Sequence, residues 1–299
     1  MSLVIVGSLA FDTIQTPRER REKVVGGSCT YCALAASFFT SPKIVGVVGE
    51  DFPREIIQFF QSKKIDTRGL EARPGKTFFW EGHYGYDPEQ RETIKTEINV
   101  FRDFRPKLPA SYRRAEIVFL ANIDPDLQDE ILSQMESPAL VAMDTINLWI
   151  ATKPEGIWRV LKKVNIFFAN EEEIKMLSQE TNLIKAARRV LASGPRLAVI
   201  KKGEHGALVL GRDFVFGVLG HPCEDVVDPT GAGDSFAGGF LGYLDKAGKI
   251  SRPQIRRAAV FGSVMASFAI EDFSIERFKA LRSEEIEKRF REFRRLVTF

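Results

Sequence analysis

One stretch decides what the rest of the chain must support: Asp228-Pro229-Thr230-Gly231-Ala232-Gly233-Asp234-Ser235-Phe236-Ala237-Gly238-Gly239. Thr230 is a good helix N-cap, but Gly231 and Gly233 follow in the first turn, where each costs about 1 kcal/mol relative to Ala. Bare backbone at a helix N-terminus presents unpaired N–H groups and a partial positive charge, which suits a phosphate. Asp234 lies in the same turn, where phosphoryl transfer places a base for the attacking hydroxyl. The alternative is that Asp234 only complements the helix dipole and that the glycines only allow close packing.

Asp228 to Phe236 resembles the C-terminal signature of the PfkB, or ribokinase-like, carbohydrate kinases. The resemblance covers essentially the whole chain. It implies a three-layer α/β/α fold with a mostly parallel central sheet and a small β-sheet lid, in a single domain over residues 1–299. It also implies an ATP-dependent kinase that phosphorylates a hydroxyl and uses Mg²⁺. In that case Asp234 is the catalytic base, and the backbone N–H groups of Gly231, Ala232 and Gly233 stabilise the charge on the transferring group.

Composition describes an ordinary globular protein. The chain has 299 residues, of which 44% are hydrophobic and 28% are charged. A net charge of +3 is too small and too dispersed to indicate a nucleic-acid partner. No apolar run reaches the roughly 18 residues of a membrane span, so no membrane partner is expected. Three cysteines without a signal peptide favour the reducing cytoplasm.

Cys29 and Cys32 match the C-x-x-C spacing of zinc and redox sites. A zinc site needs two further ligands at suitable spacing, and only Cys223 and three histidines remain. We therefore interpret the pair as two small residues one helical turn apart.

Apolar runs of strand length alternate with helical patterns through most of the chain. Such alternation predicts right-handed βαβ units and a parallel sheet. The expected strands are residues 3–6, 44–48, 117–120, 140–143, 165–168 and 196–200, with an antiparallel pair at 207–210 and 214–218. The expected helices are residues 28–39, 53–62, 126–136, 154–163, 171–178, 182–193, 231–247, 253–269 and 276–295.

Residues 76–101 differ from this pattern, because they mix aromatics and β-formers with polar residues around a turn at Asp87 to Gln90. This pattern predicts a hairpin with one apolar face and no helix to cover it. With residues 13–25 it should form the β lid outside the main sheet. The apolar face must be buried, and a second copy of the lid would do so, which predicts a homodimer.

Polar side chains recur where the expected strands end, the edge at which open α/β sheets bind ligands. They are Asp12 after the first strand, Asn122 and Asp124, then Asp144 and Asn147, then Asn170 and Glu173, and finally Lys201. One such residue is commonly a helix cap. Several at one edge, together with Asp228 to Asp234, predict a shared crevice.

On the nucleotide side, Asn170-x-x-Glu173 matches the N-x-x-E motif of the family. The resemblance implies that this pair binds Mg²⁺ through water, because magnesium keeps several waters and takes few protein ligands. Asn170 before three glutamates would also make a good helix start.

Lys201 to Gly206 resembles the family's nucleotide-binding loop, with Gly203 and Gly206 where its glycines fall. Lys201 replaces a residue that commonly carries a hydroxyl, and it could reach a phosphate or point to solvent. Asp228 and Thr230 match positions that in ribokinases help to bind a monovalent cation such as K⁺. The remaining ligands would come from a loop near Glu271 to Ser274.

On the acceptor side, Asp12 and the Gly26-Gly27 pair stand where ribokinases bind sugar hydroxyls. Asp124 stands about where they carry a glutamate, and Asn122 precedes it at the same strand end. Tyr31 replaces a residue that is usually Asn and could stack on a ring. These departures place ribose itself in doubt as the acceptor, but not a polyhydroxylated small molecule.

Three alternatives to a sugar kinase remain open. A nucleoside kinase of the same fold could clasp a base with the aromatic residues Phe11, Tyr31, Phe79, Trp80 and Tyr84. A sugar-phosphate kinase would need clustered cations, for which Arg102 and Arg105 are candidates. A non-catalytic ligand sensor would have no need of Asp234. Other nucleotide signatures, including Walker A and G-x-G-x-x-G, are absent from the sequence.

Overall fold

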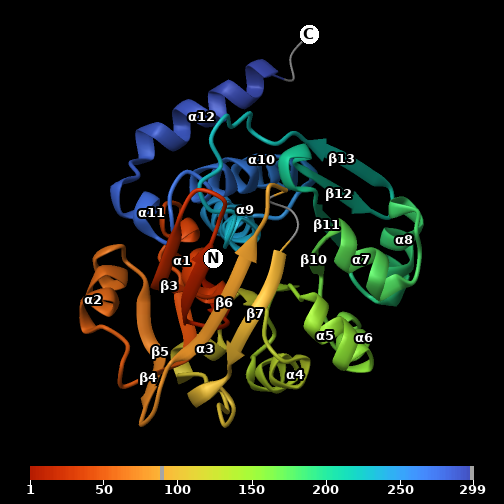
Figure 1. Cartoon of the computed structure of the whole chain (residues 1–299). Helices are drawn as coiled ribbons and strands as arrows, with labels where there is room; N and C mark the ends of the chain where they lie inside the picture. The colour runs from red at the N-terminus through yellow and green to blue at the C-terminus, as the bar shows by residue number, and fades with distance from the viewer. Residues whose placement is uncertain (88–90, 297–299) are drawn as a thin grey trace.

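The computed structural model describes residues 1–87 and 91–296, so Pro88 to Gln90 of the expected turn lie outside the described residues. The main sheet has nine strands in the order β13-β12-β11-β10-β9-β8-β1-β4-β5 (Figure 1). Its strands are β1 (Leu3–Val6), β4 (Lys43–Gly49), β5 (Asp66–Arg73), β8 (Ile117–Leu120), β9 (Leu140–Met143), β10 (Ile166–Asn170), β11 (Leu197–Lys201), β12 (Ala207–Gly211) and β13 (Phe214–Val218). All neighbours from β5 to β11 pair in parallel, while β12 and β13 run antiparallel.

Each central strand is buried on both faces, as a parallel sheet between helices requires. In β1, Leu3 and Ile5 belong to one apolar cluster, whereas Val4 and Val6 belong to the other. The first cluster includes residues of α1 (Ser28–Ser37), α2 (Arg54–Ser62), α9 (Ala232–Ala247), α10 (Arg252–Ala269), α11 (Glu276–Ala280) and α12 (Ser283–Leu296). The second includes residues of α3 (Ala110–Arg113), α4 (Pro125–Gln134), α5 (Asn147–Thr152), α6 (Pro154–Leu161), α7 (Glu171–Ser178) and α8 (Leu183–Ser193). The predicted three-layer α/β/α architecture is confirmed.

A second sheet of four strands lies apart from the main sheet and is called the lid here (Figure 1). Its order is β3-β2-β6-β7, with β2 (Ala10–Gln15), β3 (Arg20–Gly26), β6 (Phe78–Tyr84) and β7 (Arg91–Glu97). The two hairpins are joined through a parallel pairing of β2 with β6, from Ala10 opposite Phe78 to Gln15 opposite His83. One lid face packs Ile14 and Tyr84 against Phe273 of the same chain. The homodimer through the lid stays a prediction.

Small residues bring α1 and α9 into close contact beneath the cleft. A Cβ at Gly238 would lie 2.2 Å from the carbonyl oxygen of Cys32, and one at Gly242 would lie 2.9 Å from the Cα of Ala36. Cys29 and Cys32 are both buried with free thiols. This packing accounts for the C-x-x-C spacing without a zinc ion.

Three parts of the element prediction differ from the structure. Strand β5 was not predicted, because its residues are half-buried or exposed at the edge of the sheet and four of the eight are charged. The single helix expected over 276–295 is two helices, α11 and α12, separated where Leu281 takes an extended conformation. The short helices α3 and α5 were also not predicted. Within the described residues, no helix combines the length and apolar character that crossing a bilayer requires.

Candidate active site

A cleft of about 710 Å³ opens between the lid and the carboxyl edge of the main sheet. Lid residues Tyr84 and Arg91 line one side of it. The other side is lined by residues at strand ends and at the start of α9, namely Asn122, Asp144, Asn170, Glu173, Lys201, Gly203, Gly206, Gly231, Ala232, Gly233 and Asp234. Parallel strands bring their carboxyl ends to one edge, so five of the strand-end residues expected to share a crevice do line this cleft: Asn122, Asp144, Asn170, Glu173 and Lys201. Asp12, Asp124 and Asn147, which were expected there too, lie outside its lining.

The N-terminus of α9 is shaped by Gly231, whose φ of 76° lies in the left-handed region that favours glycine. A Cβ at this position would also lie 2.3 Å from the ring of Tyr31. The N–H of Ala232 donates to the carbonyl of Pro229 at 3.3 Å. The sequence-based prediction that this N–H is free to bind a phosphate is therefore wrong. Among the described residues, the N–H groups of Gly231, Gly233 and Asp234 have no backbone acceptor. Three donors are thus free to bind an anion, with Asp234 in the place of Ala232.

Asp234 lies in the first turn of α9, on the wall of the cleft. Burial raises the pKa of its carboxyl group to about 7, and the charge of Asp144 adds to the increase. The cations of Lys201 and Arg91 oppose it. A carboxyl group whose pKa lies near 7 is well matched to accept a proton at neutral pH.

Lys201 does not point into solvent. Its ammonium lies 2.6 Å from Oδ2 of Asp144, and its side chain is 17% exposed. Burial lowers the pKa of Lys201, but the charges of Asp144 and Glu173 raise it more, so the ammonium stays charged. A Cβ added to Gly233 would lie 3.1 Å from this nitrogen, so Lys201 stands directly beside the free N–H groups of α9.

Asn170 and Glu173 form a capping box at the start of α7. The Asn170 N–H donates to Glu173 Oε2 at 2.7 Å, and the Glu173 N–H donates to Asn170 Oδ1 at 2.7 Å. The helix-start alternative is thus present in the geometry, yet both residues also line the cleft. Burial raises the pKa of Glu173 to about 7, with Lys201 opposing the increase. Its second carboxylate oxygen has no hydrogen-bond donor among the described residues, which leaves it available to a metal-bound water.

Asp12 and the Gly26-Gly27 pair come together as predicted, although Asp12 lies on lid strand β2. The backbone N–H of Gly27 lowers the pKa of the Asp12 carboxyl group. A Cβ at Gly26 would lie 1.8 Å from Asp12 Oδ2, so only glycine leaves room for this carboxyl group. Burial raises the pKa of Asp12 to about 8, and the nearby charges of Asp228 and Asp234 add to it.

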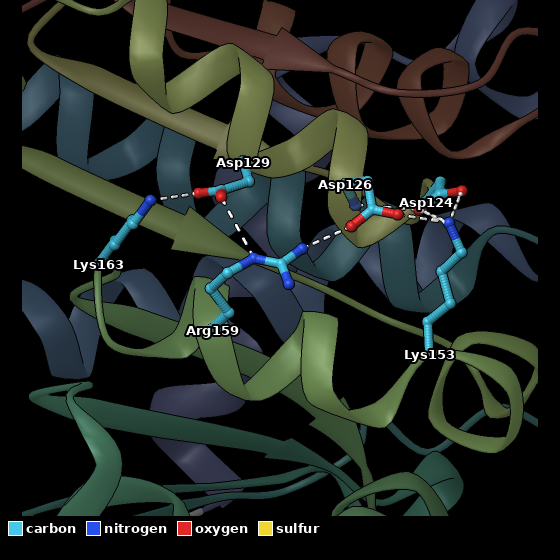
Figure 2. A network of polar contacts seen from close by, with 6 residues as sticks. All are labelled: Asp124, Asp126, Asp129, Lys153, Arg159 and Lys163. Atoms are coloured by element: carbon cyan, nitrogen blue, oxygen red, sulfur yellow. Dashed lines mark hydrogen bonds and ion pairs between the residues drawn. The ribbon is translucent and has the colours of Figure 1, made fainter.

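Two predicted acceptor residues are placed differently. Tyr31 is 1% exposed beneath Gly231, so its ring is covered and cannot stack on a ligand in this structure. Asp124 caps α4 by accepting from the Asp126 N–H and pairs with Lys153 at 2.7 Å (Figure 2). Its carboxylate is held on the α4 side, outside the lining of the cleft. Asn122 does line the cleft, and its Oδ1 accepts from Trp149 Nε1 at 3.2 Å.

Asp228 is fully buried and joins two loops. Its carboxylate accepts from the Thr230 N–H at 2.8 Å and from the Ser274 N–H at 3.2 Å. The Thr230 hydroxyl lies 3.1 Å from the hydroxyl of Tyr84. The loop that was expected to complete a monovalent-cation site is therefore adjacent. Across residues 1–87 and 91–296, no group of three or more His, Cys, Asp or Glu side chains could hold a metal ion by itself.

Sequence reasoning assigned no role in the cleft to Arg91 and no partner to Asp144. Arg91 reaches the cleft from the start of β7, and its charge lowers the pKa of Asp12, Glu173 and Asp234. No sequence signal distinguishes this exposed arginine from its neighbours on the strand. Asp144 was noted only as a strand-end residue, and its pairing with Lys201 depends on two strands that are far apart in sequence.

The chain has a three-layer α/β/α fold, a small β lid, and a carboxylate at a glycine-rich helix N-terminus between them. This is the arrangement of a small-molecule kinase. The chain belongs to the pfkB family of carbohydrate kinases, whose family model matches residues 2–276. Kinases of this family use ATP and transfer a phosphoryl group to a hydroxyl acceptor.

Relatives of this chain include two archaeal nucleoside-type kinases. It is 31% identical over 252 residues to a cytidine kinase of Thermococcus kodakarensis, covering 81% of this chain and 88% of the relative. It is 32% identical over 295 residues to a nucleoside kinase of Methanothermobacter thermautotrophicus, covering 90% and 89%. Among solved structures, the nucleoside kinase of Burkholderia thailandensis in complex with inosine has a TM-score of 0.80, with 19% identity and 97% of both chains covered. At that identity the likeness shows the fold alone.

Proposed function

We propose that this protein is a nucleoside kinase that transfers the γ-phosphoryl group of ATP to a hydroxyl of the acceptor's ribose. The observation that carries the proposal is Asp234, a carboxyl group with a pKa of about 7 that lines the cleft beside the free N–H groups at the start of α9. The sequence alone favoured a sugar as the acceptor. The relatives that match nearly nine-tenths of their length are a cytidine kinase and a nucleoside kinase, and they favour the nucleoside.

In the proposed reaction, the acceptor oxygen attacks the γ-phosphorus as its proton moves to Asp234. The bond from the γ-phosphorus to the bridging oxygen breaks, and ADP leaves with that electron pair. The free N–H groups of Gly231, Gly233 and Asp234 face the charge that develops on the transferring group. Preorganised donors of this kind typically contribute about 10²–10³ in rate.

Asn170 and Glu173 fit the role of holding Mg²⁺ through water, because both line the cleft and, among the described residues, only one carboxylate oxygen of Glu173 accepts an N–H. The ion would neutralise charge on the phosphates of ATP. Asp228, Thr230 and the adjacent loop at Ser274 fit a monovalent-cation site less completely, because both oxygens of Asp228 already accept backbone N–H groups. A cytoplasmic location remains part of the proposal.

The test is a panel of ribonucleosides, free sugars and sugar phosphates assayed for ADP release, with the product identified by mass. At least one nucleoside should show a kcat/KM about 100-fold or more above that of free ribose. A sugar or sugar phosphate that is used better than every nucleoside would overturn the choice of acceptor. Stabilisation of the protein by ATP without any turnover would instead favour the non-catalytic sensor.

A further inference from the structure

Lys201 lies where the end of β11 meets the start of α9, beside the predicted phosphate site. It is the last residue of β11, and its side chain runs across the face of Gly233 at the start of α9. The hypothetical Cβ of Gly233 would lie 3.1, 3.4 and 3.6 Å from Nζ, Cδ and Cε of Lys201. A full positive charge thus lies next to backbone donors that carry only partial ones.

Asp144 holds this ammonium in place. Its side chain is 3% exposed, and its Oδ2 lies 2.6 Å from Nζ of Lys201. The other carboxylate oxygen accepts the N–H of Thr145 at 2.9 Å, so the carboxylate is fixed at both ends. A lysine side chain has considerable rotamer freedom, and a buried partner of this kind removes it before a ligand arrives.

We propose that Lys201 is a catalytic residue whose ammonium binds the terminal phosphates of ATP, and that Asp144 is the positioning residue that holds it there. The proposal rests on the proposed use of ATP. It deepens that proposal by naming the protein side chain whose positive charge binds the phosphates. As the γ-phosphoryl group passes to the acceptor oxygen, Lys201 stabilises negative charge on the oxygens around it. Its own bonds and protonation state do not change.

The competing explanation is that Lys201 only neutralises Asp144. A single substitution cannot separate the two, because removing Lys201 leaves a buried carboxylate without its partner and destabilises the fold. The informative protein is the double variant Lys201→Met/Asp144→Asn, which removes both charges and keeps similar side-chain shapes. Lys249→Met, at an exposed position beyond the far end of α9, controls for the loss of one lysine.

The double variant should melt close to the wild type, because neither charge is left unpaired. Its affinity for ATP should fall about tenfold or more, its affinity for ADP should fall less, and its affinity for AMP should not change. Its kcat should fall about 100-fold. The measurements are calorimetric titrations with the three nucleotides in Mg²⁺ buffer, a turnover assay and a melting curve. Lys249→Met should match the wild type in all of them.

Near-normal turnover in the double variant would overturn the proposal, because Lys201 would then be only a counter-ion. Equal losses of affinity for ATP and AMP would also overturn it, since they indicate a deformed cleft. If the double variant does not fold, Lys201→Arg keeps both charges and should retain the preference for ATP over AMP within about threefold. Loss of that preference in a folded Lys201→Arg variant would contradict a role at the phosphates.

These titrations contain no acceptor, so they do not depend on which acceptor is phosphorylated. If the wild type does not phosphorylate nucleosides but the double variant binds ATP more weakly, the proposed acceptor is wrong and the role of Lys201 stands. The reverse result would leave the nucleoside kinase and remove Lys201 from its mechanism.

Discussion

At Asp234, opposing neighbours set a carboxyl pKa of about 7. Burial and the charge of Asp144 favour the protonated form, whereas Lys201 and Arg91 favour the carboxylate. Because a base must be deprotonated to accept a proton, the catalysed rate should rise as pH increases through 7. The same side chain in water would already be ionised near pH 4 and would be a weaker base.

Asp234→Asn tests this role at the residue itself. The variant keeps the side chain's shape but cannot accept the proton, so kcat should fall about 100-fold or more. ATP affinity should change much less, because the backbone donors of α9 remain. If Asp234 only complements the helix dipole, turnover should be near normal and stability should fall by about 0.3–1 kcal/mol. Measuring kcat and the melting temperature of the same variant separates these outcomes.

The parts of the site that could be predicted from the sequence are those whose function is carried by local backbone. Gly231, Gly233 and Asp234 lie in one helical turn, so their spacing alone places them together. Tyr31 could not be placed, because whether its ring is open or covered depends on how Gly231 packs against it. Arg91 could not be found at all, since its role depends on how the lid sits over the sheet.

At the scale of elements, α4 and α6 are joined by a ladder of alternating charges (Figure 2). Lys153 pairs with Asp124 and Asp126, Arg159 pairs with Asp126 and Asp129, and Lys163 pairs with Asp129. The side chain of Arg159 is 47% exposed. Exposed ion pairs are individually weak, but in this network the four inner charges each serve two partners, so their side chains are ordered only once.

Arg159→Met should therefore destabilise the protein by about 0.2–1 kcal/mol at low salt. The loss should shrink at about 1 M salt, where the Debye length falls to about 3 Å and exposed charges are largely screened. Lys185→Met, at an exposed position of α8, is the control for removal of a helical cation. Chemical denaturation of both variants at low and high salt is the measurement. A loss that does not depend on salt would mean that Arg159 contributes by packing its aliphatic stem.

Elements were predictable where hydrophobic period and length agreed, as in β8, β9 and α7. Strand β5 was not predicted, because a half-buried edge strand carries no continuous apolar run. The break between α11 and α12 was not predicted, because no glycine or proline marks it and the helical pattern continues through Arg282. Both cases depend on contacts between distant parts of the chain, which a local pattern does not contain.

For the whole molecule, raised carboxyl pKa values concentrate in the cleft and close beside it. The pKa is about 8 for Asp12 and about 7 for Glu173 and Asp234. Between pH 4 and these values the folded state binds more protons than the unfolded state, so the free energy of unfolding falls as pH rises. The lowered pKa of Asp66, about 2, acts in the opposite direction but only below pH 4.

The protein should accordingly unfold more easily at pH 8 than at pH 5, by about 1 kcal/mol or more. Asp12→Asn removes one of the groups responsible and should flatten this dependence. Denaturant titrations of both proteins at the two pH values provide the comparison. If the free energy of unfolding changes by the same amount between the two pH values in the wild type and the variant, Asp12 titrates as it would in water.

The pairing of β2 with β6 places Trp80 directly opposite Asp12, and the guanidinium of Arg91 lies 5.4 Å from the centre of its ring. The lid therefore contains an optical probe beside the predicted acceptor hydroxyl site. With Trp149→Phe and Trp158→Phe, all remaining indole fluorescence would come from Trp80. Its emission should change when an acceptor binds in the absence of ATP, and this change should be lost in Asp12→Asn. Stopped-flow recording of this signal would then time the arrival of the acceptor separately from the chemical step.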